Sequence, residues 1–149
     1  MKDLALLAIR VYFGVALLYF AEQGGIAKWN WGAQNVASNV VVGLGTPFSQ
    51  APLLFAWCVI LAEFVGSISL CLGFLTEFGA LMFTGNFLVA VYAHLVLWKH
   101  DIMSVIFNSA NVHGAAVYAI AGLVVFMAGP GAFSLDAVLF RGSKKSKPE

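Results

Sequence analysis

Four ionisable side chains stand inside or at the ends of long apolar runs, where a charge is costly. They are two carboxylates and two imidazoles: Glu22, Glu63, His94 and His113. A charge at the centre of a bilayer costs about 2.5 kcal/mol or more, so such residues face the protein interior and are paired or protonated. Carboxylates and imidazoles in a helical core can hold a metal ion, or can exchange protons with a quinone headgroup.

The depth of each group follows from its position along its helix, which rises ~1.5 Å per residue. Counting from the helix ends expected to be cytoplasmic places Glu63 at about 18 Å and the other three groups at about 24 to 27 Å. Arg10 and Asn86 fall lower, at about 9 and 12 Å, and form a separate inner polar layer. We therefore predict that Glu63 and His94 line one cavity in the outer half of the protein. The identity of any metal stays open.

Each of these residues also has a purely structural interpretation. We predict that Glu63 pairs with Arg10 across the first two helices, and this pair could serve only to hold the two helices together. Glu22 and His113 could be solvated residues at the membrane surface, and His100 stands in a charged loop. As functional hypotheses, we assign catalytic roles to Glu63, His94 and Arg10, and cofactor contacts to Glu22, Glu63, His94 and His113.

The composition places the chain in a membrane. Its 149 residues are 61% hydrophobic and 10% charged, with a mean hydropathy of +0.90. Soluble domains carry about 25% charged residues, so this chain is too apolar for that class. A formal charge of +1 without a basic stripe argues against a nucleic-acid partner. We expect the lipid bilayer to surround the protein, and any chemistry to take place in or at the membrane.

Apolar runs of about 20 residues can cross the ~30 Å hydrocarbon core of a bilayer. The sequence predicts an all-α integral membrane four-helix bundle, built as a single domain over residues 1–149. A turn at Thr76-Glu77 should make the second and third helices antiparallel neighbours. The predicted spans are residues 4–21, 53–75, 78–98 and 108–128, and residues 129–149 form a cytoplasmic tail.

The segment between the first two predicted helices is rich in Gly, Asn, Trp and Pro. It predicts a long loop, or a short interfacial helix from Asn35 to Leu44. We interpret Trp29 and Trp31, beside Lys28, as an anchor at the level of the lipid headgroups. The apolar stretch from Phe133 to Phe140 is expected to lie along the cytoplasmic interface.

Several short motifs match one known family. They are Arg10-x-x-x-Gly14 in the first predicted helix, Glu63-Phe64-Val65-Gly66 and Leu72-Gly73-Phe74-Leu75-Thr76 in the second, His94 in the third, and Gly129-Pro130-Gly131-Ala132-Phe133-Ser134-Leu135-Asp136 after the fourth. With these residues, the chain resembles the DoxX family of small bacterial membrane proteins.

The resemblance implies a four-helix bundle in the bacterial inner membrane. Family members resemble the membrane subunit of thiosulfate:quinone oxidoreductases, and others are associated with thiol redox and oxidative-stress complexes. A redox-associated subunit that interacts with quinone is thus implied, with other membrane or redox subunits as partners and a homo-oligomer as a further option. The alternative is a non-catalytic scaffold or accessory subunit of a larger membrane complex. A small transporter or channel would need a continuous polar path from Arg10 to the outer layer.

Lys and Arg residues are distributed unevenly between the two sides of the predicted bundle. The positive-inside rule places the richer side, and both termini, in the cytoplasm. The richer side holds Lys2, Arg10, Arg141, Lys144, Lys145 and Lys147, against Lys28 and Lys99 on the other side.

This orientation predicts the accessibility of the C-terminal tail. In a chain whose two native cysteines are replaced by serine, Ser146→Cys should react with a membrane-impermeant thiol reagent only after the cells are permeabilised. Labelling of intact cells to the same extent would show that the orientation is wrong.

Overall fold

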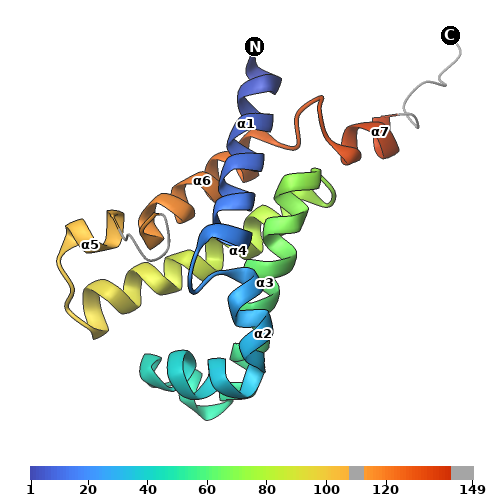
Figure 1. Cartoon of the computed structure of the whole chain (residues 1–149). Coiled ribbons are helices and arrows are strands. Elements are labelled where there is room, and N and C mark those ends of the chain that lie inside the picture. Colours follow the sequence, from blue (N-terminus) through green and yellow to red (C-terminus); the bar gives the residue numbers. More distant parts are fainter. Residues whose placement is uncertain (108–112, 142–149) are drawn as a thin grey trace, which may run out of the picture.

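The computed structural model describes residues 1–107 and 113–141, and every regular element in this part of the chain is a helix. Figure 1 shows their arrangement, in which α4 packs against both α3 and α6. The elements are α1 (Lys2–Val15), η1 (Ala16–Phe20), α2 (Gly25–Val36), η2 (Ala37–Val41), η3 (Val42–Leu44), η4 (Phe48–Gln50), α3 (Pro52–Leu72), α4 (Thr76–Tyr92), η5 (Ala93–Leu97), α5 (Ile102–Ile106), α6 (Ala115–Ala128) and α7 (Leu135–Arg141).

Three helices are long and apolar enough to cross a membrane: Lys2–Phe20, Pro52–Leu72 and Thr76–Leu97. They correspond to the first three predicted spans. The apolar helix α6 has 14 residues, which rise ~21 Å, short of the ~30 Å hydrocarbon core. The fourth crossing, and with it the four-helix bundle, stays a prediction.

The predicted fourth span, residues 108–128, started too early. The described helix begins at Ala115, because the Gly114 N–H donates to the carbonyl of Ile106, 2.9 Å away, and Gly114 has an extended backbone. Residues 108–112 lie outside the described part of the chain.

The turn between α3 and α4 falls earlier than the predicted Thr76-Glu77. Gly73 has a φ of +67° and ends α3, and Leu75 is also left-handed, with a φ of +48°. Ser69 closes this turn, since its carbonyl accepts the Gly73 N–H at 2.8 Å and its hydroxyl donates to the Phe74 carbonyl. The predicted span therefore overran by the three residues that form the turn.

The segment between the first two spans is mostly helical, where the sequence predicted a long loop or a short helix from Asn35 to Leu44. Helix α2, bent at Gly32 (φ +76°), is followed directly by η2 and η3. Both α2 and η2 pack against α3. The predicted helix from Asn35 to Leu44 falls within this longer helical segment. The earlier part of the segment was not predicted as a helix because it is too polar to resemble a span, although one side of the segment is apolar. That side is buried against α3 through Val36, Val41, Ala56 and Ile60.

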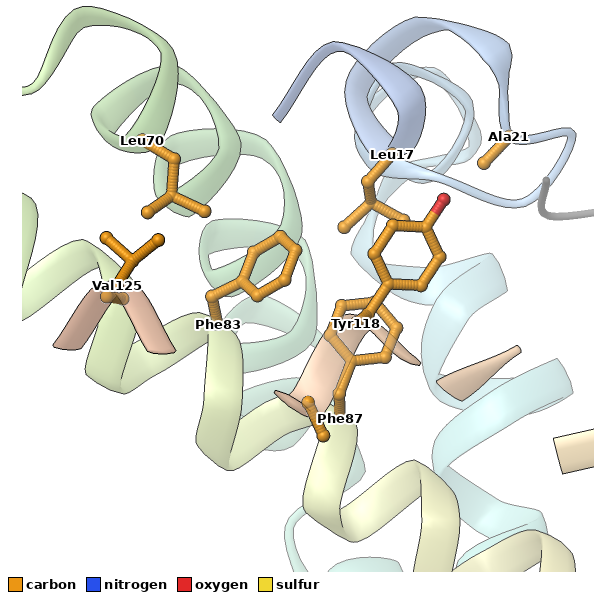
Figure 2. Packing of buried hydrophobic residues seen from close by; sticks show 9 residues of the cluster. Leu17, Ala21, Leu70, Phe83, Phe87, Tyr118 and Val125 are labelled. Carbon is orange, nitrogen blue, oxygen red and sulfur yellow. The ribbon is translucent and has the colours of Figure 1, made fainter. Parts of the chain in front are cut away.

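Aromatic residues fill the main core, where α1, η1, α3, α4 and α6 meet. Figure 2 shows Tyr118 of α6 beside Leu17 and Phe87, with Phe83 next to them. The rings of Phe87 and Tyr118 are stacked, with centroids 4.9 Å apart. Tyr118 is fully buried. This core ties α6 to the three longer helices.

A buried arginine joins the first helix to the segment after α6. Arg10 of α1 is 1% exposed, and its guanidinium donates to the backbone carbonyls of Pro130 and Phe133. Asp3 accepts the Ala132 N–H at 2.9 Å in the same region. The N-terminus therefore lies at the same end of the molecule as the segment after α6, as Figure 1 shows.

Helix α7 in turn caps α4. Ser134 begins α7 by accepting the Ala137 N–H at 3.0 Å. Asp136 accepts the N–H groups of Leu75 and Thr76, both at 2.8 Å, at the first turn of α4. A carboxylate is favourable there, because the N-terminal amides of a helix lack partners and carry a partial positive charge.

This cap predicts a dependence on pH. Burial alone would raise the pKa of the Asp136 carboxyl, but the hydrogen bonds from Thr76 and Leu75 and the charge of Arg10 lower it below its usual value. The stabilisation is therefore complete above the ordinary Asp pKa of about 4, and is lost as the pH falls through the lower folded pKa. The distance distribution between spin labels at Val138 and Leu81 should broaden on acidification.

The matched control is Asp136→Asn, which keeps the shape of the side chain and removes its titration. In this variant the distribution should be broad at neutral pH and insensitive to acid. A variant that broadens with acid as the parent does would mean that another group holds α7 in place.

Candidate functional site

Glu63 forms a bidentate ion pair with Lys28, in the middle of the apolar helix α3. The Lys28 Nζ lies 2.8 Å from Oε1 and 2.7 Å from Oε2 of Glu63, and Asn86 Nδ2 of α4 donates to Oε1 at 3.0 Å. The Glu63 side chain is only 4% exposed and that of Lys28 12%. The carboxylate is thus neutralised and hydrogen-bonded, as a charge in apolar surroundings requires.

A glycine brings these two residues together. A Cβ on Gly25 would lie 2.9 Å from the Glu63 carbonyl oxygen and 3.0 Å from Phe64 Cα, so only glycine lets the start of α2 touch α3 here. Lys28 follows three residues later, almost one turn along α2, on the same side of the helix. Trp29 then stacks on Phe64, with ring centroids 4.7 Å apart. The close contact at Gly25 aims Lys28 at Glu63.

The ion pair borders a cavity of about 250 Å³. Its polar lining includes Asn86, His94 and His113 besides the ion pair, and its apolar walls come from several helices. The lining residues are Leu17, Gln23, Lys28, Asn39, Val40, Leu44, Val59, Glu63, Asn86, Phe87, Val89, Ala90, Ala93, His94, Trp98, His113, Ala115 and Tyr118.

Three π-helical segments contribute to this lining. Leu17 belongs to η1, Asn39 to η2 and His94 to η5. In each segment a backbone N–H reaches back five residues, as from Trp98 to Ala93 at 2.9 Å. π-Helical turns are rare and occur often at functional sites, because they shift side chains out of the regular helical register. Three such turns line this one cavity, which is therefore a good candidate for a functional site.

The structure places Glu63 and His94 in the lining of one cavity, as predicted. The ring of His94 lies 4.9 Å from that of Trp98, and its Nδ1 is buried without a hydrogen-bond partner among the described residues. His113 also lines the cavity, and its Nε2 lies 2.8 Å from the Tyr12 hydroxyl. The roles assigned to these residues stay predictions.

Two other candidates lie elsewhere. Glu22 is exposed and does not belong to the cavity lining. Arg10 donates to the carbonyls of Pro130 and Phe133, so the expected pairing of Arg10 with Glu63 is wrong. The Arg10 guanidinium bonds carbonyl groups of the segment after α6. Glu63 is instead neutralised by Lys28, which was expected in an interfacial anchor.

Lys28 was not predicted as a site residue, and Asn86 was predicted in a different layer from Glu63. Lys28 was interpreted as part of an interfacial anchor, and Asn86 as a member of the Arg10 layer. The Gly24-Gly25 pair ahead of Lys28 was the available signal, because small residues permit close helix contact. With α3 ending at Leu72 and α4 beginning at Thr76, the same counting places Glu63 at ~13.5 Å and Asn86 at ~15 Å, so the two side chains lie in one layer.

A metal site is not assembled in the described ranges, 1–107 and 113–141. Within them, no group of three His, Cys, Asp or Glu side chains is close enough to hold a metal ion.

A larger open hollow of about 730 Å³ lies beside the N-terminus and α7. It is lined in part by Asp3 and Asp136, whose carboxylates already accept backbone N–H groups. The smaller cavity is therefore the candidate site.

Three apolar helices of spanning length and a cavity with a buried ion pair define a multi-pass membrane protein. A family model described as DoxX matches residues 5–96, more than half of the chain. The protein therefore belongs to the DoxX family. The Gly129 to Asp136 motif lies beyond the matched residues. No curated protein and no solved structure matched the chain.

The ion pair predicts a coupled response to mutation. Lys28→Met should destabilise the protein by about 3 to 5 kcal/mol, because it leaves a buried carboxylate unpaired. Adding Glu63→Gln should recover much of that loss, since no charge is then left in the apolar core. Thermal unfolding of the purified protein in one detergent would measure both effects.

Lys99→Met is the matched control, because Lys99 is exposed in the loop after η5. It should change the unfolding temperature little, alone or with Glu63→Gln. Strictly additive effects of Lys28→Met and Glu63→Gln would show that the two residues are not coupled.

Proposed function

We propose that this DoxX protein is a membrane subunit of a redox system and binds a quinone headgroup in the cavity beside Glu63 and His94. The observation that carries the proposal is the buried His94 Nδ1, which lacks a partner among the described residues and belongs to a side chain in the cavity lining. An unpaired buried polar atom costs about 1 to 3 kcal/mol, so a ligand that bonded it would regain that energy.

The lining fits the chemistry of a quinone ring. Phe87, Trp98 and Tyr118 offer aromatic surface, while Lys28, Asn86 and His94 offer N–H groups that can bond a carbonyl oxygen. Pockets that bind small molecules have this composition, with apolar walls and a few placed polar groups. The residues present therefore fit the headgroup.

A bound quinone would take up two electrons and two protons to become a quinol, with the electrons supplied by a partner redox subunit. Glu63, His94 and His113 provide groups that can exchange protons at the cavity wall. Lys28 pairs with Glu63 and, through its charge, would favour negative charge on a nearby oxygen. Arg10 has no place in this chemistry, since its guanidinium bonds the segment after α6 and it does not line the cavity.

The proposal includes the location in the membrane. Four crossings, by α1, α3, α4 and α6, would bring the chain back to the side from which it started. The contacts of Asp3 and Arg10 with the segment after α6 support this arrangement. Together with the charge asymmetry of the loops, they favour a bacterial inner-membrane protein with both termini in the cytoplasm.

A non-catalytic scaffold is the second candidate. It is favoured by the internal pairing of Lys28 with Glu63, which leaves no net charge for chemistry, and by the apolar surface of α4, where Leu81 and Leu88 are each more than half exposed. In that case the cavity would hold only lipid or water, and the protein would act by docking to other subunits.

Quinone binding separates the two candidates. In lipid nanodiscs, a ubiquinone analogue should quench the fluorescence of Trp98 in the cavity lining, and Trp98→Phe identifies that part of the signal. His94→Ala should weaken binding about tenfold, the equivalent of one hydrogen bond of ~1.4 kcal/mol.

His100→Ala is the matched control, because His100 is exposed and stands outside the described cavity lining. It should leave the dissociation constant unchanged. Absence of saturable quenching in the wild-type protein, or equal effects of the two histidine variants, would favour the scaffold.

A further inference from the structure

Helix α7 is attached to the protein through polar residues, while its apolar residues are exposed. Asp136 accepts two N–H groups at the start of α4, and Ser134 begins α7. Figure 1 shows α7 outside the group formed by α1, α3, α4 and α6. The large apolar side chains of α7 are between 41% and 73% exposed: Leu135, Val138, Leu139 and Phe140. A helix normally buries its apolar side, so this one requires a cover that the described part of the chain does not supply.

The length and the position of α7 fit the surface of a bilayer. Its seven residues rise ~10 Å, far too little to cross the ~30 Å hydrocarbon core. Through Asp136, α7 is bound to the first turn of α4, where the candidate span Thr76–Leu97 begins. The end of a span lies where the hydrocarbon meets the lipid headgroups. A helix lying in that plane can bury its apolar side among the acyl chains.

Exposed apolar residues alone do not single out α7, but the charges beside it do. Helix α5 is the comparable short helix, since Ile102 and Met103 are each more than half exposed. The charges next to α5, on Lys99 and Asp101, cancel each other. In contrast, the seven residues 141–147 include no acidic residue and four basic ones, namely Arg141, Lys144, Lys145 and Lys147. An apolar interfacial helix with a basic run beside it is typical of a segment that recognises anionic lipids.

We propose that α7 and the basic residues after it bind the anionic phospholipids of the leaflet at this end of the molecule. The apolar side chains of α7 enter the acyl region, and the basic residues bind the phosphodiester groups. Each Lys or Arg near an anionic surface strengthens such binding about fivefold. A nucleic acid would satisfy the charges but leave Val138 uncovered, whereas an anionic bilayer meets both needs. Because Asp136 caps α4, lipid bound to α7 also holds that cap in place.

The test measures the depth of a spin label at Val138→Cys, in the full chain with both native cysteines replaced by serine. The nanodiscs contain either phosphatidylcholine alone or phosphatidylcholine with phosphatidylglycerol. Collisions of the label with oxygen, which dissolves in hydrocarbon, are compared with its collisions with a water-soluble nickel chelate. The ratio should rise when phosphatidylglycerol is present and fall back in high salt, which screens the charges. Replacing Lys144, Lys145 and Lys147 together by Gln should abolish the rise, since each lysine shifts the label toward immersion about fivefold.

Two controls accompany this measurement. Replacing the same three lysines by Arg keeps the charge and should preserve the rise, and a label at Met103→Cys on α5 should give the same ratio in both lipids. A Val138 label that stays exposed to the nickel chelate in both lipids would overturn the inference and leave a protein partner as the cover of α7. Equal immersion in both lipids and in the Gln variant, or an equal rise at Met103, would overturn the recognition of anionic lipid. None of these outcomes bears on the proposed quinone site, because the inference does not depend on it.

Discussion

The pairing of Lys28 with Glu63 is the interaction on which the candidate site depends. A carboxylate in the middle of an apolar helix must be neutralised. Here the cation is Lys28 of α2, a helix of 12 residues that is too short to cross a bilayer. The pair therefore holds α2 against α3, with Gly25 allowing the contact. Because α2 is fixed there, η2 and η3 are brought over the cavity and supply part of its wall.

The same requirement shapes the opposite end of the molecule in a different way. There, charged side chains satisfy backbone groups instead of one another. Arg10 bonds the carbonyls of Pro130 and Phe133, and Asp136 bonds the amides at the start of α4. These contacts hold α1 and the start of α4 against the segment after α6 and the first turn of α7.

Much of the fold followed from hydrophobic run length, since an apolar stretch of about 20 residues has few alternatives to a membrane helix. Three spans were predicted within a few residues, and the errors fell at glycines. Gly73 ends α3 through its left-handed backbone, and Gly114 precedes α6 with its N–H bonded to the Ile106 carbonyl. Hydropathy alone predicts neither feature. The helical structure of the polar segment before α3 was only partly predicted, because only one side of the segment is apolar. The packing of that side on α3 is evident only in the structure.

The sequence by itself determined that the chain is helical and lipid-embedded and that Glu63 needs a partner. Tertiary structure decided which cation is that partner. Distance along a helix constrains depth, whereas pairing depends on how each helix is rotated and on how closely two backbones approach. At Gly25 that approach is set by the absence of a side chain. From the sequence, Arg10 was the expected partner of Glu63 and Lys28 was expected in an interfacial anchor. The packing of α2 on α3 made Lys28 the counter-ion instead.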